Sequence, residues 1–265
     1  MIKLIVSQLG MLTDQSHHVD FSALQACLQK AKQHHARLMI LSASSYPRLL
    51  TEFQSVDGPL DYGAENGAET VVNGVNIREK MIDAITLSQI LDWLNQKSEF
   101  AKAAVTLSSR ISTLTNAQPD RQIYRRLKRC YPTVHPASDL LMIASQIYQI
   151  RVDVPASNVA PYQKLFRQRF SDQIKLINGG SNYFYVVSPE VDWGSAVASA
   201  QKDLGVRNRQ MAAFGKSIAD FNYLNAAKYS FAAAGANPAL QAVAKLLPQS
   251  PHAVFQQISR LLDRK

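Results

Sequence analysis

Two short apolar runs with an amphipathic segment between them limit what the start of this chain can fold into. Residues 3–9 (KLIVSQL) and 38–41 (LMIL) are almost continuously apolar, which predicts two strands buried on both faces of a sheet. Residues 21–36 carry apolar side chains at helical spacing, with basic side chains toward the end. A strand, a helix and a strand at this spacing predict a right-handed crossover between parallel strands, and therefore an α/β fold.

The last third of the chain returns to this alternation. The expected elements are a helix at 194–206, a strand at 209–215, a helix at 217–227, a strand at 229–234 and a final amphipathic helix (HAVFQQISRLLDR). In the first third, a helix from Tyr46 to about Ser55 precedes Asn-Gly pairs at 66–67 and 73–74, which predict turns of a hairpin.

The middle third has a different character. It predicts helices at 86–97, 119–130 and 159–170, and strands at 147–154, 173–178 and 183–188. Strands and helices without a doubly wound order indicate a small α+β domain. We therefore expect a doubly wound, mostly parallel, Rossmann-like core formed by 1–83 and 187–265, with an α+β cap, 84–186, inserted into it.

Charge is concentrated in the expected cap. The chain has a net charge of +9, and residues 84–186 hold 13 Lys and Arg against 6 Asp and Glu. This surplus could form a surface for nucleic acid or an acidic partner, or a solvated face. The basic side chains concerned are Arg121, Arg125, Arg126, Lys128, Arg129, Arg151, Lys164, Arg167 and Arg169. No RNA-binding motif or aromatic platform accompanies them, so nucleic acid is the less favoured partner.

Other features point to an ordinary cytoplasmic protein. No window approaches the roughly 18 to 20 apolar residues of a membrane helix, and the apolar start lacks a small-residue cleavage site. Cys27 and Cys130 stand far apart without a CxxC pattern, so we expect two reduced thiols in or near the core. The paired histidines 17–18 and 34–35 point in different directions within each pair and predict no metal site.

Four segments in the right order resemble a known family. They are KLIVSQLGMLTD near the start, LMILSASSYPRLL, AENGA at 64–68, and AFGKSIADFNYLNAAKYSFA at 213–232. Together they resemble the Cof-type subfamily of the haloacid-dehalogenase superfamily, especially its bacterial sugar-phosphate phosphatases. The resemblance runs nearly from end to end and implies a doubly wound core with an α+β cap inserted between the second and third of four motifs.

The resemblance also implies a reaction, the hydrolysis of phosphomonoesters. An Asp after the first strand would attack phosphorus, and a second Asp two residues later would act as acid and base. A Ser or Thr after the second strand would hold the phosphate and a later Lys would neutralise it. A carboxylate pair in the last motif would hold Mg²⁺.

The first motif of this chain departs from the family pattern. Gln8 stands where the nucleophile is expected and Gly10 where the acid/base is expected. An amide is a poor nucleophile and glycine has no group that could protonate a leaving oxygen. The first acid of the chain, Asp14, lies well past the strand end.

The second and third motifs are altered as well. Ser42 aligns with the phosphate-binding hydroxyl and is either a phosphate ligand or a polar cap for the next helix, while Ser44 replaces the arginine two residues later. Trp193 stands where the phosphate-neutralising lysine is expected. Its indole either stacks on a ligand or fills the vacated space, and we favour the second.

In the fourth motif only the last acid remains. Lys216 replaces a metal-binding carboxylate, and Asp220 is kept. An ammonium about 4 Å from a divalent ion would be repelled by roughly 8 kcal/mol at an effective dielectric constant near 20. We therefore expect no metal cofactor, and we expect Lys216 to pair with Asp220 in the place of the ion.

These departures predict a phosphatase-like protein without the standard chemistry, and no catalytic residue is assigned. We expect a non-catalytic binding or regulatory protein whose cleft holds a small phosphorylated or sugar-like ligand. The candidate ligand-binding residues are Ser42, Ser44, Asn66, Lys216 and Asp220. One alternative is a Mg²⁺-dependent hydrolase that uses displaced groups, namely Asp14, Asp192 and Asp220. The other is a basic cap that binds nucleic acid or an acidic partner.

Overall fold

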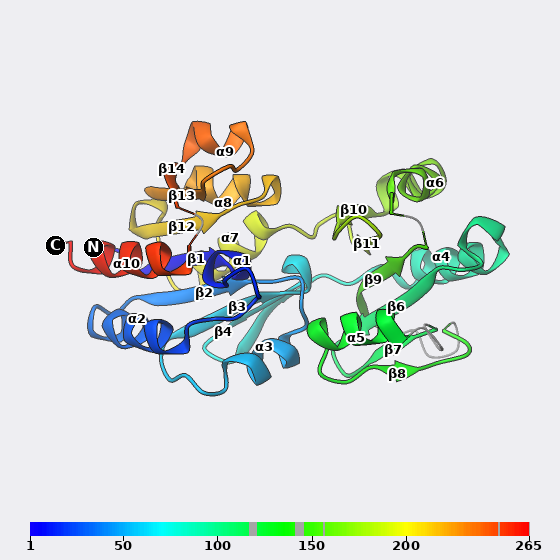
Figure 1. Ribbon diagram of the computed structural model, residues 1–265, viewed down its shortest axis with the longest axis horizontal. Coiled ribbons are helices and arrows are strands. Elements are labelled where there is room, and N and C mark those ends of the chain that lie inside the picture. The colour runs from blue at the N-terminus through cyan, green and yellow to red at the C-terminus, as the bar shows by residue number, and fades with distance from the viewer. Residues whose placement is uncertain (117–120, 141–145, 156, 249, 265) are drawn as a thin grey trace. The chain divides into compact units, whose positions relative to one another are not determined.

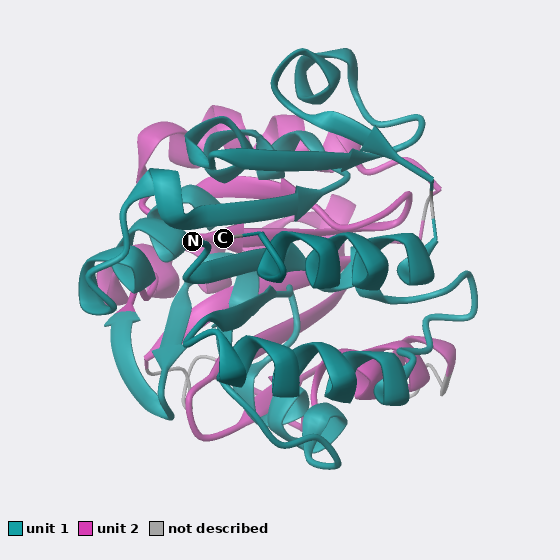
Figure 2. Cartoon of the chain, turned by 90° about the vertical axis from the view of Figure 1, so that its left-hand side faces the viewer, with its two compact units in different colours: residues 1–78, 192–265 teal, residues 79–191 magenta. Residues whose placement is uncertain are grey.

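The structure, a computed structural model, describes the whole chain except residues 117–120, 141–145, 156, 249 and 265. The chain divides into two compact units (Figure 2). Unit 1 consists of residues 1–78 and 192–265, and unit 2 of residues 79–191. The predicted cap, 84–186, lies within unit 2, whose sheet continues to Val187 at the end of its strand β11.

An eight-stranded sheet forms the centre of unit 1, in the order β14-β13-β12-β1-β2-β3-β4-β5 (Figure 1). From β14 to β3 every neighbouring pair is parallel, and β4 runs antiparallel to β3. The strands are β1 (Leu4–Gln8), β2 (Arg37–Leu41), β3 (Leu60–Ala64), β4 (Glu69–Val72), β5 (Val75–Glu79), β12 (Met211–Gly215), β13 (Tyr229–Ala233) and β14 (Lys245–Leu247). The predicted parallel α/β core is confirmed.

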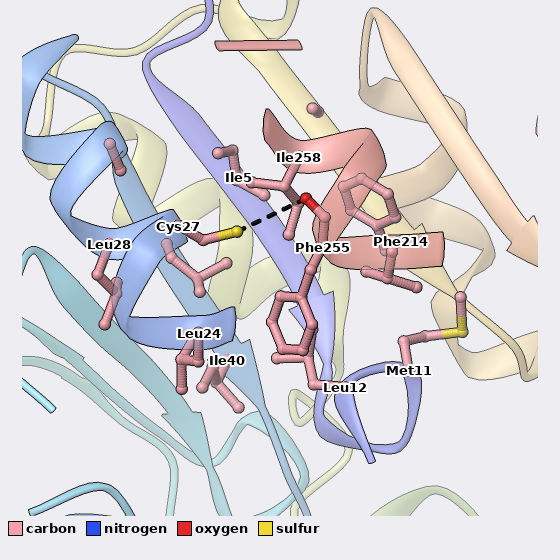
Figure 3. Close-up of a cluster of buried hydrophobic side chains, with 14 of the residues drawn as sticks. Ile5, Met11, Leu12, Leu24, Cys27, Leu28, Ile40, Phe214, Phe255 and Ile258 are labelled. Carbon is pink, nitrogen blue, oxygen red and sulfur yellow. Dashed lines mark hydrogen bonds between the residues drawn. The ribbon is translucent and has the colours of Figure 1, made fainter. Parts of the chain in front are cut away.

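Helices cover both faces of this sheet because its central strands are apolar on both sides. On one face Ile5, Ile40 and Phe214 pack with helices α2 (Phe21–Gln33), α3 (Tyr46–Phe53) and α10 (Pro251–Leu262) (Figure 3). On the other face Leu4, Met39 and Ala213 pack with α7 (Trp193–Asp203), α8 (Phe221–Ala226) and α9 (Pro238–Val243). Alternate strand residues therefore serve opposite layers, as in a doubly wound fold.

Unit 2 is built on a six-stranded sheet in the order β10-β11-β9-β6-β7-β8. Its strands are β6 (Ala104–Ser109), β7 (Thr113–Thr115), β8 (His135–Pro136), β9 (Ile147–Asp153), β10 (Lys175–Asn178) and β11 (Tyr183–Val187). All neighbouring pairs are antiparallel except β7 and β8. This is the mixed α+β character predicted for the middle third.

The helices of unit 2 cover opposite faces of its sheet. Helices α4 (Ala84–Gln96) and α6 (Ala160–Phe170) pack on the apolar face, where Ile150 and Val152 of β9 point. Helix α5 (Arg121–Cys130) lies on the other face, where Gln149 and Arg151 point: the Gln149 amide donates to the Tyr131 hydroxyl just after α5. Helices α5 and α6, which carry most of the basic side chains of the expected cap, therefore cover opposite faces of this sheet.

Short elements depart most from the predictions. The chain turns into a one-turn helix, α1 (Leu9–Leu12), directly after Gln8, where we expected the first strand to continue to Leu9. Helix α9 and strand β14 were not predicted. The Asn-Gly turn is confirmed at 73–74, where both residues have positive φ.

Both cysteines are free thiols, as predicted. Cys27 is buried between α2 and α10, and its Sγ lies 3.6 Å from the carbonyl oxygen of Phe255 (Figure 3). Burial raises the pKa of this thiol. Within the described residues, no helix has both the length and the apolar character that a membrane span requires.

Candidate functional site

The altered motif residue Gln8 and two of the candidate ligand-binding residues, Ser42 and Lys216, end or follow adjacent parallel strands. β1 ends at Gln8, Ser42 follows β2, and Lys216 follows β12. β1 lies between the other two strands and is in register with both, with Gln8 opposite Leu41 of β2. Because the strands are parallel, their carboxyl ends meet at one edge of the sheet, where ligands bind in open α/β folds.

Gln8 is the last residue of β1, and Gly10 is the second residue of α1. The amide oxygen Oε1 of Gln8 is buried and has no hydrogen-bond partner in the described part of the chain. The carbonyl oxygen of Gly10 lies 3.3 Å from Nζ of Lys216, which donates to it. A Cβ placed on Gly10 would lie 2.3 Å from the same Nζ, so the ammonium fills the space that a side chain at position 10 would need.

Asp220 is fully buried and serves the backbone of the fourth motif. Its Oδ2 accepts hydrogen bonds from the N–H groups of Lys216 and Ser217, each at 2.8 Å, and from the Ser217 hydroxyl at 3.0 Å. Burial raises the pKa of Asp220, although these hydrogen bonds oppose the rise. The Tyr223 hydroxyl, which donates to the Phe214 carbonyl at 3.0 Å, has a raised pKa for the same reason.

The predicted ion pair between Lys216 and Asp220 is therefore wrong. Lys216 reaches Asp220 through its backbone N–H, and its exposed side chain turns to the Gly10 carbonyl instead. Three donors of the same turn occupy Oδ2 of Asp220, and Oδ1, which has no partner among the described residues, is buried, whereas the Lys216 side chain is exposed to solvent.

Ser42 stabilises the loop that follows β2. Its buried Oγ accepts from the N–H of Ser44 at 3.1 Å, and its carbonyl accepts from the N–H of Asn66 at 3.2 Å. The Ser42 hydroxyl is a local cap of this loop rather than the cap of α3, which begins after Ser45. Its own hydrogen remains a donor that can face a ligand.

Asn66 lies in a strained turn between β3 and β4. Glu65, Asn66 and Gly67 all have positive φ, which is uncommon for residues with a side chain. Asn66 is buried, and the turn is tied to the loop after β2 by the bond from Asn66 N to Ser42 and by one from Glu65 N to the Ser44 carbonyl. Strained backbone of this kind concentrates at functional sites.

Asp192 and Trp193 are structural residues of α7. Asp192 caps the helix by accepting from the N–H of Ser195 at 2.9 Å and from the Ser195 hydroxyl. The indole of Trp193 is 6 % exposed and belongs to the apolar cluster with Leu4 and Met39. The expectation that this indole fills space in the core fits its position.

Asp14 stabilises an exposed turn after α1. Its Oδ1 accepts from the N–H groups of Ser16 and His18 at 2.8 and 2.9 Å, inside a turn closed by a bridge between Thr13 and Val19. The hydrogen bond from His18 is the main reason that the pKa of Asp14 is lowered. The Asp14 carboxylate therefore stabilises this turn by accepting hydrogen bonds from two of its backbone N–H groups.

The residues at the sheet edge do not fit the Mg²⁺ that the family resemblance implies. Gln8 offers a neutral amide, Gly10 offers only its carbonyl, and Lys216 brings an ammonium to that carbonyl. Oδ2 of Asp220 already accepts three hydrogen bonds, and its buried Oδ1 has no partner among the described residues. In the described ranges of the chain, no three His, Cys, Asp or Glu side chains come together as a metal site.

Each unit has a cavity beside its helices. In unit 1, a hollow of about 410 Å³ runs between α7 and α8 and is lined by Asp192, Ser195, Gln201 and Asn222 among others. In unit 2, a hollow of about 270 Å³ lies beside α4 and is lined by Leu91, Asn95, Asn116 and Asp139 among others. Sequence reasoning missed both, because they arise from the way helices and loops pack together, which no local pattern records.

Sequence reasoning also missed the relationship between Gly10 and Lys216. Each residue was recognised as a departure from the family pattern, but their contact joins positions 206 residues apart. The sequence did contain a signal for this contact. One motif lacks a side chain at Gly10, another gains a cation at Lys216, and both motifs lie at the same edge of the sheet.

A parallel sheet covered on both faces, a second unit inserted into its sequence, and polar residues behind β1, β2 and β12 define an α/β protein of the core-and-cap class. The chain belongs to the haloacid dehalogenase-like hydrolase family, which it matches over residues 10–253. The resemblance seen in the motifs is thereby confirmed.

Known relatives are distant in sequence and close in fold. The chain is 20 % identical over 246 residues to 5-amino-6-(5-phospho-D-ribitylamino)uracil phosphatase YbjI of Escherichia coli strain K12, covering 92 % of this chain and 89 % of that protein. The crystal structure of SMU.1108c from Streptococcus mutans UA159 matches with a TM-score of 0.87 at 19 % identity, covering both chains completely. A haloacid dehalogenase-like hydrolase from Bacteroides thetaiotaomicron matches with a TM-score of 0.84 at 16 % identity, over 98 % of this chain and 100 % of that one.

Proposed function

We propose that this protein is a non-catalytic member of its family that binds a small phosphorylated ligand at the carboxyl edge of its parallel sheet. The observation that carries the proposal is the Lys216 ammonium, which fills the space of a side chain at position 10. Where the family resemblance implies an acid/base carboxylate, this chain presents a cation. A cation retains affinity for phosphate but cannot protonate and deprotonate a leaving oxygen at neutral pH in the way a carboxylate does.

The neighbouring groups support binding rather than reaction. Gln8 has an amide at the position of the nucleophile. Its Oε1 has no partner among the described residues, and its NH₂ group can donate a hydrogen bond to a phosphate oxygen. The Ser42 hydroxyl can donate as well, because its Oγ only accepts within the loop. An ammonium, an amide and a hydroxyl at one edge would suit a phosphate group.

The alternative of a hydrolase with displaced acids finds little support. Asp14 is held in an exposed turn, Asp192 caps α7, and Asp220 accepts three hydrogen bonds within the fourth motif. A nucleophilic carboxylate must be free to approach phosphorus in line with the leaving group. The nucleic-acid alternative is less favoured too, because α5 and α6, which carry most of the basic side chains of unit 2, cover opposite faces of its sheet.

Turnover and binding should be measured on the same preparation. With Mg²⁺ present, we expect no hydrolysis of p-nitrophenyl phosphate or of a panel of sugar phosphates above background. By calorimetry we expect binding of inorganic phosphate or of a panel member. This affinity should fall about tenfold or more in Lys216→Ala, because a charge-assisted hydrogen bond contributes about 1.5–3 kcal/mol.

Lys202→Ala is the matched control, since Lys202 is an exposed lysine in the last turn of α7 and should leave the affinity unchanged. Metal-dependent turnover that disappears in Asp220→Ala would overturn the non-catalytic reading. Retained turnover in Asp14→Asn would then exclude Asp14 as its nucleophile. Absence of binding across the whole panel would overturn the phosphate-binding proposal.

A further inference from the structure

We infer that the Lys216 ammonium is a tethered replacement for a divalent cation, so that the polar edge of unit 1 works without metal. The inference starts from the contact between Lys216 Nζ and the Gly10 carbonyl oxygen at 3.3 Å. A backbone carbonyl is a common ligand of hard cations, and here its partner is a cation supplied by the chain itself. A divalent metal ion and the Lys216 ammonium are both positively charged, but the ammonium is part of the chain and cannot dissociate from it.

Gly10 makes room for this cation. Any side chain at position 10 would place its Cβ 2.3 Å from Nζ and 2.6 Å from Cε of Lys216. These distances are far below van der Waals contact, so a residue with a side chain at position 10 would displace the end of Lys216. The absence of a side chain at one motif and the presence of a lysine at the other are therefore complementary parts of one arrangement.

The surroundings of Lys216 hold its backbone while leaving the ammonium free to reach this position. The N–H of Lys216 donates to the buried Asp220, which fixes the start of the turn after β12. The Lys216 side chain is exposed, and in the described residues no carboxylate forms an ion pair with it. Its charge therefore remains available to an anion that approaches the edge of the sheet.

Two consequences follow for metal binding. A divalent cation cannot bind at the Gly10 carbonyl while the ammonium is there, because the two positive charges would repel each other at contact distance. If the ammonium is replaced by a carboxylate, the same place offers a carbonyl, an amide from Gln8 and a new acid. The chain should then acquire a site for a hard divalent cation.

The test is a titration with Mn²⁺, followed by the loss of the free-ion paramagnetic resonance signal, with Mg²⁺ as competitor. We expect the wild-type protein and Lys216→Ala to bind Mn²⁺ at least about tenfold more weakly than Lys216→Asp, which gains a carboxylate ligand and loses the repelling charge. Lys202→Asp, an exposed lysine on α7, controls for the general effect of a new acid. Gln8→Asp added to Lys216→Asp should tighten binding further.

Thermal unfolding gives an independent reading on the same variants. In Lys216→Asp the new acid lies near Asp220, so we expect a lower melting temperature without metal and its recovery with Mn²⁺ or Mg²⁺. If wild-type protein binds Mn²⁺ as tightly as Lys216→Asp, the ammonium does not replace the ion and the inference is overturned. If folded Lys216→Asp binds no more tightly than Lys202→Asp, the place is not a cation site and the inference is overturned as well.

A second experiment measures phosphate binding, and it rests on the proposed function. Wild-type affinity for inorganic phosphate should be the same in EDTA and in Mg²⁺, whereas in Lys216→Asp it should be lost in EDTA and restored by Mg²⁺. A wild-type protein that binds phosphate only with Mg²⁺ would overturn the inference and leave the proposed function standing. Failure of all variants to bind phosphate would overturn the proposed function, while the Mn²⁺ titration would still decide the inference.

Discussion

The carbonyl oxygen of Asp192 occupies the space that a side chain on Gly67 would need. A Cβ on Gly67 would lie 2.8 Å from this oxygen and 3.4 Å from the indole of Trp193. The turn between β3 and β4 thus packs directly on the first residues of α7. Since the same turn is hydrogen bonded to the loop after β2, Gly67 links two of the segments that border the candidate site.

Gly67→Ala should destabilise the protein by about 2–3 kcal/mol, because alanine is strained at a φ of 93° and its Cβ meets a backbone atom that cannot move easily. Gly74→Ala is the matched control: its φ is 75°, but no atom lies within 4 Å of the added Cβ. Urea unfolding of both variants separates the two effects. Equal losses of stability would show that the Asp192 carbonyl yields to the new methyl group.

Trp193 should behave as a core residue. Trp193→Ala should cost about 3–5 kcal/mol in the free energy of unfolding, since it removes a buried indole from the cluster around Leu4 and Met39. Trp193→Phe should cost much less and leave the affinity for inorganic phosphate unchanged. A ligand-stacking role would give the opposite pattern, with lost affinity in Trp193→Phe and little loss of stability. Urea unfolding and calorimetry on the two variants decide between these outcomes.

The long elements were predictable from the sequence because their periodicity is strong. The buried strands β1, β2 and β12 and the amphipathic helices α2, α4 and α10 follow directly from the spacing of apolar residues. The one-turn helix α1 and the three-residue strand β14 were not predictable, because elements this short contain too few repeats for a periodic pattern to be recognised.

The candidate site was predictable in location and not in its contacts. Because β1, β2 and β12 are parallel, Gln8, Ser42 and Lys216 at or after their ends must lie at one edge of the sheet, and this does not depend on where their side chains point. Whether the Lys216 ammonium turns to Asp220 or to Gly10 depends on which hydrogen-bond acceptors the folded loop leaves open, and no spacing rule contains that information. The division of the basic residues between α5 and α6 likewise depends on which face of the sheet each helix covers.

Arg151 and Asp153 should stabilise unit 2 only as a pair. Both are almost fully buried, and the Arg151 guanidinium donates from Nε at 2.7 Å and from Nη2 at 2.8 Å to the two oxygens of Asp153. The guanidinium also lies over the Tyr183 ring, 3.7 Å from its centroid. Removing one partner leaves the other charge buried, and Asp153 would then keep the more distant contact with Arg126, at 3.8 Å.

Arg151→Met should therefore cost about 3–5 kcal/mol in the free energy of unfolding, whereas Arg151→Met combined with Asp153→Leu should recover much of that loss. Urea unfolding of the two single variants and the double variant gives the coupling energy. If the losses of the single variants simply add in the double variant, the two side chains do not stabilise each other. Arg125→Met, at an exposed position of α5, is the matched control and should change stability little.

Asp220 should make the stability of the protein fall with rising pH relative to an Asn variant. Burial raises the pKa of Asp220 in the folded protein above its ordinary value of 3.8, so the folded state holds this proton more tightly than the unfolded chain does. At low pH Asp220 is protonated in both the folded and the unfolded state, and its full contribution to the free energy of unfolding is present. As the pH rises from the ordinary value through the raised one, the unfolded chain releases the proton first and stability is lost. Asp220→Asn removes this titration and keeps an acceptor for the N–H groups of Lys216 and Ser217.

We therefore expect the free energy of unfolding of Asp220→Asn to increase relative to that of wild type as the pH rises from about 4 toward neutrality, so that the variant becomes the relatively more stable protein. Urea unfolding at a series of pH values measures this difference directly. Ser217→Ala is a useful companion, because it removes the hydroxyl that donates to Oδ2 of Asp220 at 3.0 Å and should raise the carboxyl pKa further. A difference between Asp220→Asn and wild type that shrinks with rising pH would mean that the hydrogen bonds from the turn outweigh burial and hold Asp220 ionised.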